Sequence, residues 1–219
     1  MSLFQNRREA GRRLAERLQA YAGAAGAVVL GLPRGGLPIA AEVADALGCP
    51  LDVLVVRKLG VPGHEELAMG AVASGGGRVV NEEIVHDLRL SADTVERVAA
   101  RELAELERRE RVFRGDRAPP RLEGKTVILV DDGIATGATM RSAVAAVRSS
   151  APARVVVAAP VAAAESLTRL EGEADEIVCL ATPDPFLAVG RWYLDFPQTG
   201  DDEVRELLAA HRPTAAEGP

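Results

Sequence analysis

The sequence predicts an α/β fold: a doubly wound, mostly parallel sheet with helices on both faces, plus a small hood from the chain termini. Two observations favour this fold. Short apolar runs rich in valine alternate with stretches of helical periodicity, which is typical of parallel strands joined by crossover helices. Some of these runs also break into loops of glycine and other small residues, as strands do at the ligand-binding edge of such sheets.

The composition fits a single domain spanning 1–219. The chain is 47% hydrophobic and 26% charged, an ordinary globular balance that can bury a substantial core. The net charge of −6 disfavours nonspecific nucleic-acid binding, which needs a basic face, but leaves room for a local cluster that holds a small anion. Cys49 and Cys179 are too far apart in the sequence for a redox pair, and we expect reduced thiols.

The hydropathy pattern gives no sign of a membrane protein. No run of about 18 apolar residues occurs, so no spanning helix is expected. The first residues are too charged for a secretory signal, because such a signal needs an apolar stretch. We therefore expect a cytoplasmic protein with no membrane or nucleic-acid partner.

The first half of the chain supplies two helices and two strands. An amphipathic helix is predicted within 1–25, and a strand over 27–36 that breaks into a glycine-rich loop. Helical spacing follows over 37–47, with Gly48 as its C-terminal stop. The β-branched run 51–58 predicts a buried strand.

The middle of the chain is less regular. Residues 59–70 are punctuated by glycine and proline and predict a loop, and 71–81 predicts a hairpin turned at three glycines. A long charged helix is expected over 91–114, with Ser91 as its N-cap. Residues 115–124 then form a connector.

The second half returns to strict alternation. Strands are predicted over 125–130, 153–162 and 174–183, with helices from about Thr139 and over 163–171. The tail over 182–212 ends in a helix that begins at Asp201 and, with 1–25, is the candidate hood. Residues 213–219 are expected to be disordered.

The stretch VILVDDGIATGAT, residues 127–139, is the most informative motif. A buried strand runs into Asp131 and Asp132, which are expected to point into solvent at the carboxyl edge of the sheet. Adjacent carboxylates repel unless hydroxyl donors or a cation meet them, and a sugar diol or hydrated Mg²⁺ does so. The small residues and hydroxyls that follow lead into a helix N-terminus, which favours an anion. The unit is therefore suited to a ribose 5-phosphate.

This stretch resembles the phosphoribosyl pyrophosphate signature of the type I phosphoribosyltransferases, and the resemblance extends over most of the chain. It implies that Asp131 and Asp132 hold the ribose hydroxyls and, directly or through water, Mg²⁺. It also implies a 5-phosphate site in the loop that follows them, which comprises Gly133, Ile134, Ala135, Thr136, Gly137, Ala138 and Thr139.

The resemblance implies two further elements around the leaving pyrophosphate. The first is a short loop after the first strand, often with an unusual peptide geometry, to which Arg34, Gly35 and Gly36 correspond. The second is a mobile catalytic loop that begins near Arg57 and Lys58. Arg57 and Lys58 are expected to face one crevice. There Lys58 and Arg34 would neutralise charge on the departing pyrophosphate. A solvated basic pair at a strand end is the alternative for Arg57 and Lys58.

The family's variable hood recognises the acceptor. In the tail, the aromatic side chains Phe186, Trp192 and Tyr193 are candidates for stacking on a planar base, although each could equally anchor the tail to the core. The hypoxanthine-guanine branch has an aspartate where this chain has Ala135. The sequence therefore does not match that branch, and it identifies no general base for the acceptor.

The resemblance implies an enzyme that needs Mg²⁺, transfers ribose 5-phosphate from phosphoribosyl pyrophosphate to a nitrogen acceptor and releases pyrophosphate. A non-catalytic regulator that binds phosphoribosyl pyrophosphate is the alternative, although no DNA-reading segment is apparent. A hydrolase with Asp131 as nucleophile is less suited, because it would need an Asp-x-Asp pattern. The charged helix over 91–114 is a candidate homodimer surface.

Overall fold

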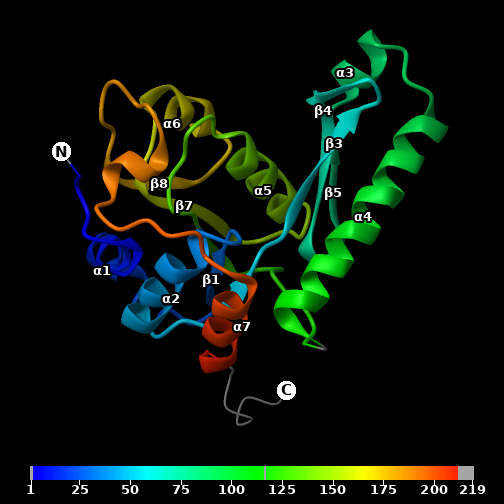
Figure 1. Cartoon of the computed structure of the whole chain (residues 1–219). Helices are drawn as coiled ribbons and strands as arrows, with labels where there is room; N and C mark the ends of the chain where they lie inside the picture. Colours follow the sequence, from blue (N-terminus) through cyan, green and yellow to red (C-terminus); the bar gives the residue numbers. More distant parts are fainter. Residues whose placement is uncertain (1, 116, 212–219) are drawn as a thin grey trace.

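The computed structural model describes residues 2–115 and 117–211, except the side chain of Glu66. A five-stranded parallel sheet lies at its centre, in the order β2-β1-β6-β7-β8 (Figure 1). The strands are β1 (Ala27–Gly31), β2 (Leu51–Val53), β6 (Thr126–Val130), β7 (Arg154–Val161) and β8 (Glu176–Ala181). The predicted α/β fold with a mostly parallel sheet is confirmed. The disorder predicted for 213–219 lies outside the described residues.

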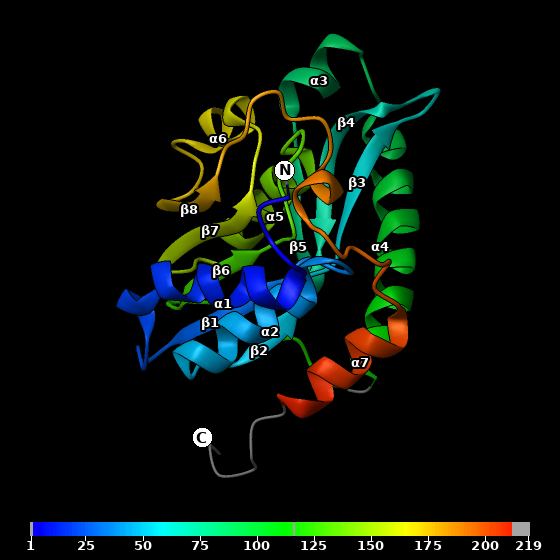
Figure 2. The same cartoon turned by 60° about the vertical axis from the view of Figure 1, so that its left-hand side comes forward.

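Helices cover both faces of this sheet, because alternate residues of each central strand point to opposite sides. Val29 and Ile128 face a core beneath α1 (Arg7–Arg17) and α2 (Gly36–Leu47), which Figure 2 shows in front of the sheet. Their neighbours in the strands face a second core beneath α5 (Ala138–Arg148), near α6 (Ala164–Leu170). β1 is buried along its whole length, which explains why it reads as a continuous apolar run.

The segment between β2 and β6 forms an arm, defined here as residues 56–114, which projects from the sheet (Figure 1). It contains the antiparallel strands β3 (Val56–Val61), β4 (His64–Ala73) and β5 (Gly77–Val80). The helices α3 (Glu82–Asp87) and α4 (Ala92–Arg114) follow. The predicted hairpin at 71–81 and the long helix are confirmed, and Ser91 Oγ caps the helix by accepting from Thr94 N at 3.2 Å.

Two predictions in this region are wrong. The run 51–58 is not one strand, because β2 ends at Val53 and β3 begins in another sheet at Val56. The expected loop 59–70 is instead the β3–β4 hairpin. The glycines of this hairpin interrupt the alternating pattern by which a strand is predicted. At Gly70 only glycine fits, because a Cβ there would lie 2.3 Å from the carbonyl oxygen of Val79 in the neighbouring strand β5.

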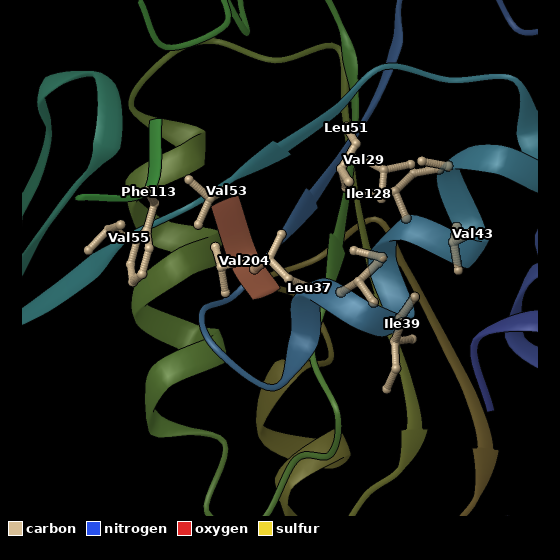
Figure 3. Packing of buried hydrophobic residues seen from close by; sticks show 14 of the residues in the cluster. Val29, Leu37, Ile39, Val43, Leu51, Val53, Val55, Phe113, Ile128 and Val204 are labelled. Carbon is tan, nitrogen blue, oxygen red and sulfur yellow. The ribbon is translucent and has the colours of Figure 1, made fainter. Parts of the chain in front are cut away.

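A buried ion pair fastens the end of α4 to the sheet. Arg114 Nε donates to Asp52 Oδ1 at 2.7 Å, and the two side chains are only 2% and 1% exposed. Arg114 also donates to the carbonyl oxygen of Val53 and pairs with Glu110. Phe113 continues the first core towards Val53 and Val55 (Figure 3). The arm is therefore attached to the edge of the sheet by packing as well as by charge.

The N-terminal segment meets the tail of the chain near the carboxyl edge of the sheet. Phe4 forms a bridge with Tyr193, and the amide nitrogens of Leu3 and Phe4 donate to the carbonyl oxygen of Trp192. The tail then turns into α7 (Asp201–Ala210), as predicted, and Val204 of α7 packs in the first core with Leu37 (Figure 3). Among the described helices, none is both long and apolar enough to cross a membrane.

Candidate active site

The two acids of the motif lie directly after β6, at the carboxyl edge of the sheet. The glycine loop before α2 packs against them. A Cβ on Gly35 would lie 1.9 Å from Asp132 Oδ2, and a Cβ on Gly36 would lie 2.6 Å from the carbonyl oxygen of Val130. Only glycine fits at such a close approach. The structure therefore brings the two loops singled out in the sequence into direct contact.

An arginine that the sequence analysis missed holds the second acid. Arg7 of α1 donates to Asp132 Oδ2 from Nε at 3.0 Å and from Nη2 at 2.9 Å. The expectation that the acids point into solvent is wrong, because Asp131 is part-buried and the side chain of Asp132 is only 16% exposed. A signal was present, since Arg7 lies three, four and seven residues before Ala10, Gly11 and Leu14, which are all buried on one face of α1.

Each carboxylate of the pair keeps one oxygen free of the protein. Asp131 Oδ1 accepts from Asp132 N at 2.8 Å, and Arg7 occupies Asp132 Oδ2. Within 2–115 and 117–211, no protein hydrogen bond reaches Asp131 Oδ2 or Asp132 Oδ1. The pair therefore presents two acceptor oxygens from adjacent residues, which suits two neighbouring hydroxyl groups.

The surroundings disfavour a double negative charge on this pair. Burial raises the pKa of Asp131 well above its ordinary value of 3.8, and the charge of Asp132 raises it further. Burial also raises the pKa of Asp132, against the opposing effect of Arg7. Hydroxyl donors or a cation would stabilise the ionised pair. The site is therefore electrostatically prepared for a ligand that brings such groups.

The loop after the acids is fixed at one end and open at the other. Ile134 forms a bridge with Ala162, and Ser166 Oγ of α6 donates to the carbonyl oxygen of Ala135 at 2.6 Å. Gly137, at φ +75°, caps α5. Around this cap the side chains of Thr136 and Thr139 are exposed. Hydroxyl groups thus surround the N-terminus of an eleven-residue helix, an arrangement that attracts phosphate.

Arg34 follows a cis peptide bond after Pro33, so the unusual geometry implied for this loop is present. Its side chain lines a hollow of about 280 Å³ together with Arg108 and Arg109 of α4 and Asp201 of α7. Arg34 contacts Asp201 at 3.4 Å, and both arginines of α4 pair with the same Glu105. Three guanidinium groups therefore share two carboxylates beside the glycine loop.

Arg57 and Lys58 do not share a crevice, which corrects the sequence-based expectation. Arg57 donates to Glu102 of α4 at 2.9 Å. Lys58 lines a groove of about 470 Å³ between the arm and α5, which includes Ala138 and Arg141. The reason is the pleat, since consecutive residues of β3 point to opposite sides. Lys58 therefore shares a groove with the start of α5 and does not line the hollow around Arg34.

The aromatic residues of the tail have different surroundings. Tyr193 is 5% exposed, packs between Phe4 and Phe196, and donates from its hydroxyl to the carbonyl oxygen of Asp132 at 2.6 Å. Its ring is therefore enclosed and anchors the tail to the acid pair. Phe186 and Trp192 are half-buried neighbours with ring centroids 6.4 Å apart. The buried Nε1 of Trp192 has no partner among the described residues.

Comparisons with known proteins agree with this geometry. The family model of the phosphoribosyl transferase domain matches residues 3–195. Two Mycobacterium tuberculosis proteins, named "Putative phosphoribosyl transferase MT0597" and "Putative phosphoribosyl transferase Rv0571c", are each 50% identical to the chain over 219 residues. The chain is fully covered in both matches but spans only 49% of each relative's length.

A solved structure resembles the whole chain. The crystal structure of TT1426 from Thermus thermophilus is 44% identical, with a TM-score of 0.87, and the match covers 97% of this chain and 100% of that one. The match to the family model over nearly the whole chain, the curated relatives and the acid pair before the loop that leads into α5 all agree. The chain belongs to the phosphoribosyl transferase domain family.

Proposed function

We propose that the protein transfers ribose 5-phosphate from phosphoribosyl pyrophosphate to a nitrogen acceptor, most simply a nucleobase, and releases pyrophosphate. The observation that carries this proposal is the pair of free oxygens on Asp131 and Asp132 beside the N-terminus of α5. Asp131 Oδ2 and Asp132 Oδ1 would accept hydrogen bonds from the two ribose hydroxyls. Thr136, Thr139 and the backbone at the start of α5 would hold the 5-phosphate.

In the proposed reaction the acceptor nitrogen forms a bond to C1 of the ribose. The bond between C1 and a pyrophosphate oxygen breaks, and its electrons leave with pyrophosphate. The acceptor nitrogen loses one proton to solvent. The carboxylates would place negative charge near the positive charge that develops on the ribose ring. Positioning, rather than covalent chemistry by the protein, supplies most of the catalysis.

The leaving group would lie over the glycine loop. Gly35 and Gly36 permit close approach of the backbone, and Arg34 faces a hollow that already holds Arg108 and Arg109. We propose that all three arginines stabilise departing pyrophosphate, which extends the role implied for Arg34. Lys58 lies across the groove from Ala138 and would meet the 5-phosphate side of the donor. Arg57 donates to Glu102 of α4 and would fix the position of that helix rather than contact the donor.

The residues of the site are compatible with Mg²⁺ that arrives with the donor. Among the described residues, no three His, Cys, Asp or Glu side chains gather into a metal site. Mg²⁺ commonly uses one or two carboxylates together with water and substrate phosphates, and Asp131 and Asp132 could supply them directly or through water. When bound, the ion would neutralise charge on the pyrophosphate.

The acceptor would enter beneath the tail. Phe186 and Trp192 offer half-buried aromatic surface, and the buried, unpartnered Nε1 of Trp192 would become a donor for a ring nitrogen or carbonyl of a base if the tail moves. This favours a planar heterocycle over an aliphatic amine. We do not assign Tyr193 to acceptor binding, because its ring is enclosed and its hydroxyl is bonded to Asp132.

The test is release of pyrophosphate from phosphoribosyl pyrophosphate in the presence of Mg²⁺ and a pool of bases and small amines. The control is the Asp131→Asn, Asp132→Asn double variant. Release that needs both a pool member and the two aspartates would support the transferase, and division of the pool would name the acceptor. Donor binding without release from any pool member would favour the regulatory alternative. No donor binding would refute both.

A further inference from the structure

We propose that Arg7 is a positioning residue, which orients Asp132 towards the ribose and couples the tail of the chain to the donor site. This inference rests on the proposed function. Arg7 lies on α1, 125 residues before Asp132 in the sequence, and neither the motif nor the resemblance assigns it a role. Its side chain is 10% exposed, and Arg7 belongs to the buried face of α1.

Every nitrogen of this guanidinium has a protein partner. Nε and Nη2 both donate to Asp132 Oδ2, and Nη1 donates to the carbonyl oxygen of Pro197 at 2.7 Å. The guanidinium also lies over the Phe196 ring, 3.7 Å from its centroid. Arg7 is therefore poorly suited to bind a phosphate itself. Its geometry fits a residue that acts through Asp132.

Both contacts of Arg7 with the acid go to the same oxygen. Two donors on Oδ2 fix the orientation of the carboxylate and leave Oδ1 free for a ligand. Gly35 also approaches Oδ2 so closely that a Cβ there would lie 1.9 Å away. The carboxylate is thus packed against both an arginine and a glycine, and little freedom remains for it to rotate. Preorganisation of this kind lowers the cost of binding the substrate.

A chain of contacts links this oxygen to the tail. Phe196, beneath Arg7, stacks on Tyr193 with ring centroids 4.8 Å apart, and Tyr193 donates to the main-chain oxygen of Asp132. Asp132 is therefore held at its side chain by α1 and at its backbone by the tail. Because Trp192 precedes Tyr193, a base that moves the tail would move the same contacts. Arg7 would then couple acceptor binding to donor binding.

The experiment measures the dissociation constant of phosphoribosyl pyrophosphate, with Mg²⁺, by calorimetry on the full chain. Variants are Arg7→Gln, Arg7→Lys and Asp132→Asn, alone and as the Arg7→Gln, Asp132→Asn pair. The matched control is Arg12→Gln, which removes an arginine of the same helix that is 60% exposed and pairs with Glu42. All are measured well below their melting temperatures. Phe196→Leu serves as a second probe, because it removes the stacking surface and leaves both charges.

We expect Arg7→Gln to weaken donor binding about tenfold or more, with little additional loss in the pair, since both changes act on one carboxylate. Arg7→Lys should recover part of the affinity, Phe196→Leu should weaken it less than Arg7→Gln, and Arg12→Gln should bind like the wild type. Additive losses in the pair, or an Arg7→Gln variant that binds normally, would overturn the inference while the proposed function stands. A wild-type protein that does not bind the donor would overturn both.

Discussion

At the scale of single residues, the buried acid pair lowers the stability of the fold but offers acceptor oxygens to a ligand. Burial raises the pKa of Asp131, so between its ordinary value of 3.8 and its folded value the native state holds more protons than the unfolded state. The free energy of unfolding therefore falls as the pH rises through that window. Above the pKa of Asp131 in the folded state, the full loss of unfolding free energy caused by the buried charge is present.

This gives a prediction for Asp131→Asn. The amide keeps an oxygen that can accept from Asp132 N but removes the buried charge, so the variant should melt at a higher temperature than the wild type at pH 8. The difference should shrink as the pH falls towards the acid range. Thermal melts across pH, with Asp195→Asn as an exposed control of equal charge change, measure it. A variant that is less stable at pH 8 would contradict the sign of the pKa shift.

Gly35 gives a second prediction at this scale. In Gly35→Ala the new carbon would lie 1.9 Å from Asp132 Oδ2, so either the loop or the carboxylate must move. Overpacking of this kind costs about 1–3 kcal/mol of stability, and we expect donor binding to fall with it. Gly200→Ala is the control, since a Cβ there meets nothing within 4 Å. Equal donor affinity in both variants would show that the contact has no part in binding.

At the scale of elements, the sequence predicts those parts whose local signals agree with the fold. Ser91 and Gly48 define helix ends as expected, because capping chemistry is local. The β3–β4 hairpin was missed because Gly60, Gly63 and Gly70 interrupt its pattern, and these glycines serve tight approaches and a turn that only tertiary structure reveals. Arg7 was missed because its charge hides a residue that belongs to the buried face of α1.

Helix α4 carries the prediction at this scale. Arg108 and Arg109 share Glu105 and line the hollow with Arg34, so their excess positive charge should attract pyrophosphate. The Arg108→Gln, Arg109→Gln double variant should bind inorganic pyrophosphate about tenfold more weakly at low salt. Arg97→Gln, an exposed change elsewhere on the helix, should have little effect. Unchanged pyrophosphate affinity in the double variant would remove α4 from the proposed site.

At the scale of the whole molecule, the site is assembled from segments distant in sequence. The motif after β6 could be assigned from sequence because its residues are contiguous, whereas its enclosure by α1 and the tail depends on packing that no local pattern encodes. The attachment of the arm likewise involves a contact between segments distant in sequence. Asp52 and Arg114 bury opposite charges at the edge strand of the sheet, and α4 ends there.

We expect Arg114→Met to destabilise the fold by about 3–5 kcal/mol, because it leaves Asp52 charged and buried without its main partner. The Asp52→Ala, Arg114→Met pair should lose less than the sum of the single changes. Denaturant unfolding of the four proteins measures this cycle. Strict additivity would mean that the arm is attached by packing around Phe113 and Val55 rather than by the ion pair.

The contact between Arg114 and Val53 has a further consequence, because it joins the point where the chain leaves the sheet to the point where the arm ends. The arm is therefore an insertion between two strands of the sheet, and the contact between Arg114 and Val53 holds its two ends together. The entropy of closing a flexible loop grows slowly, by about 0.6 kcal/mol for each doubling of its length. Insertions in the turns of the arm should therefore leave the register of the five-stranded sheet unchanged.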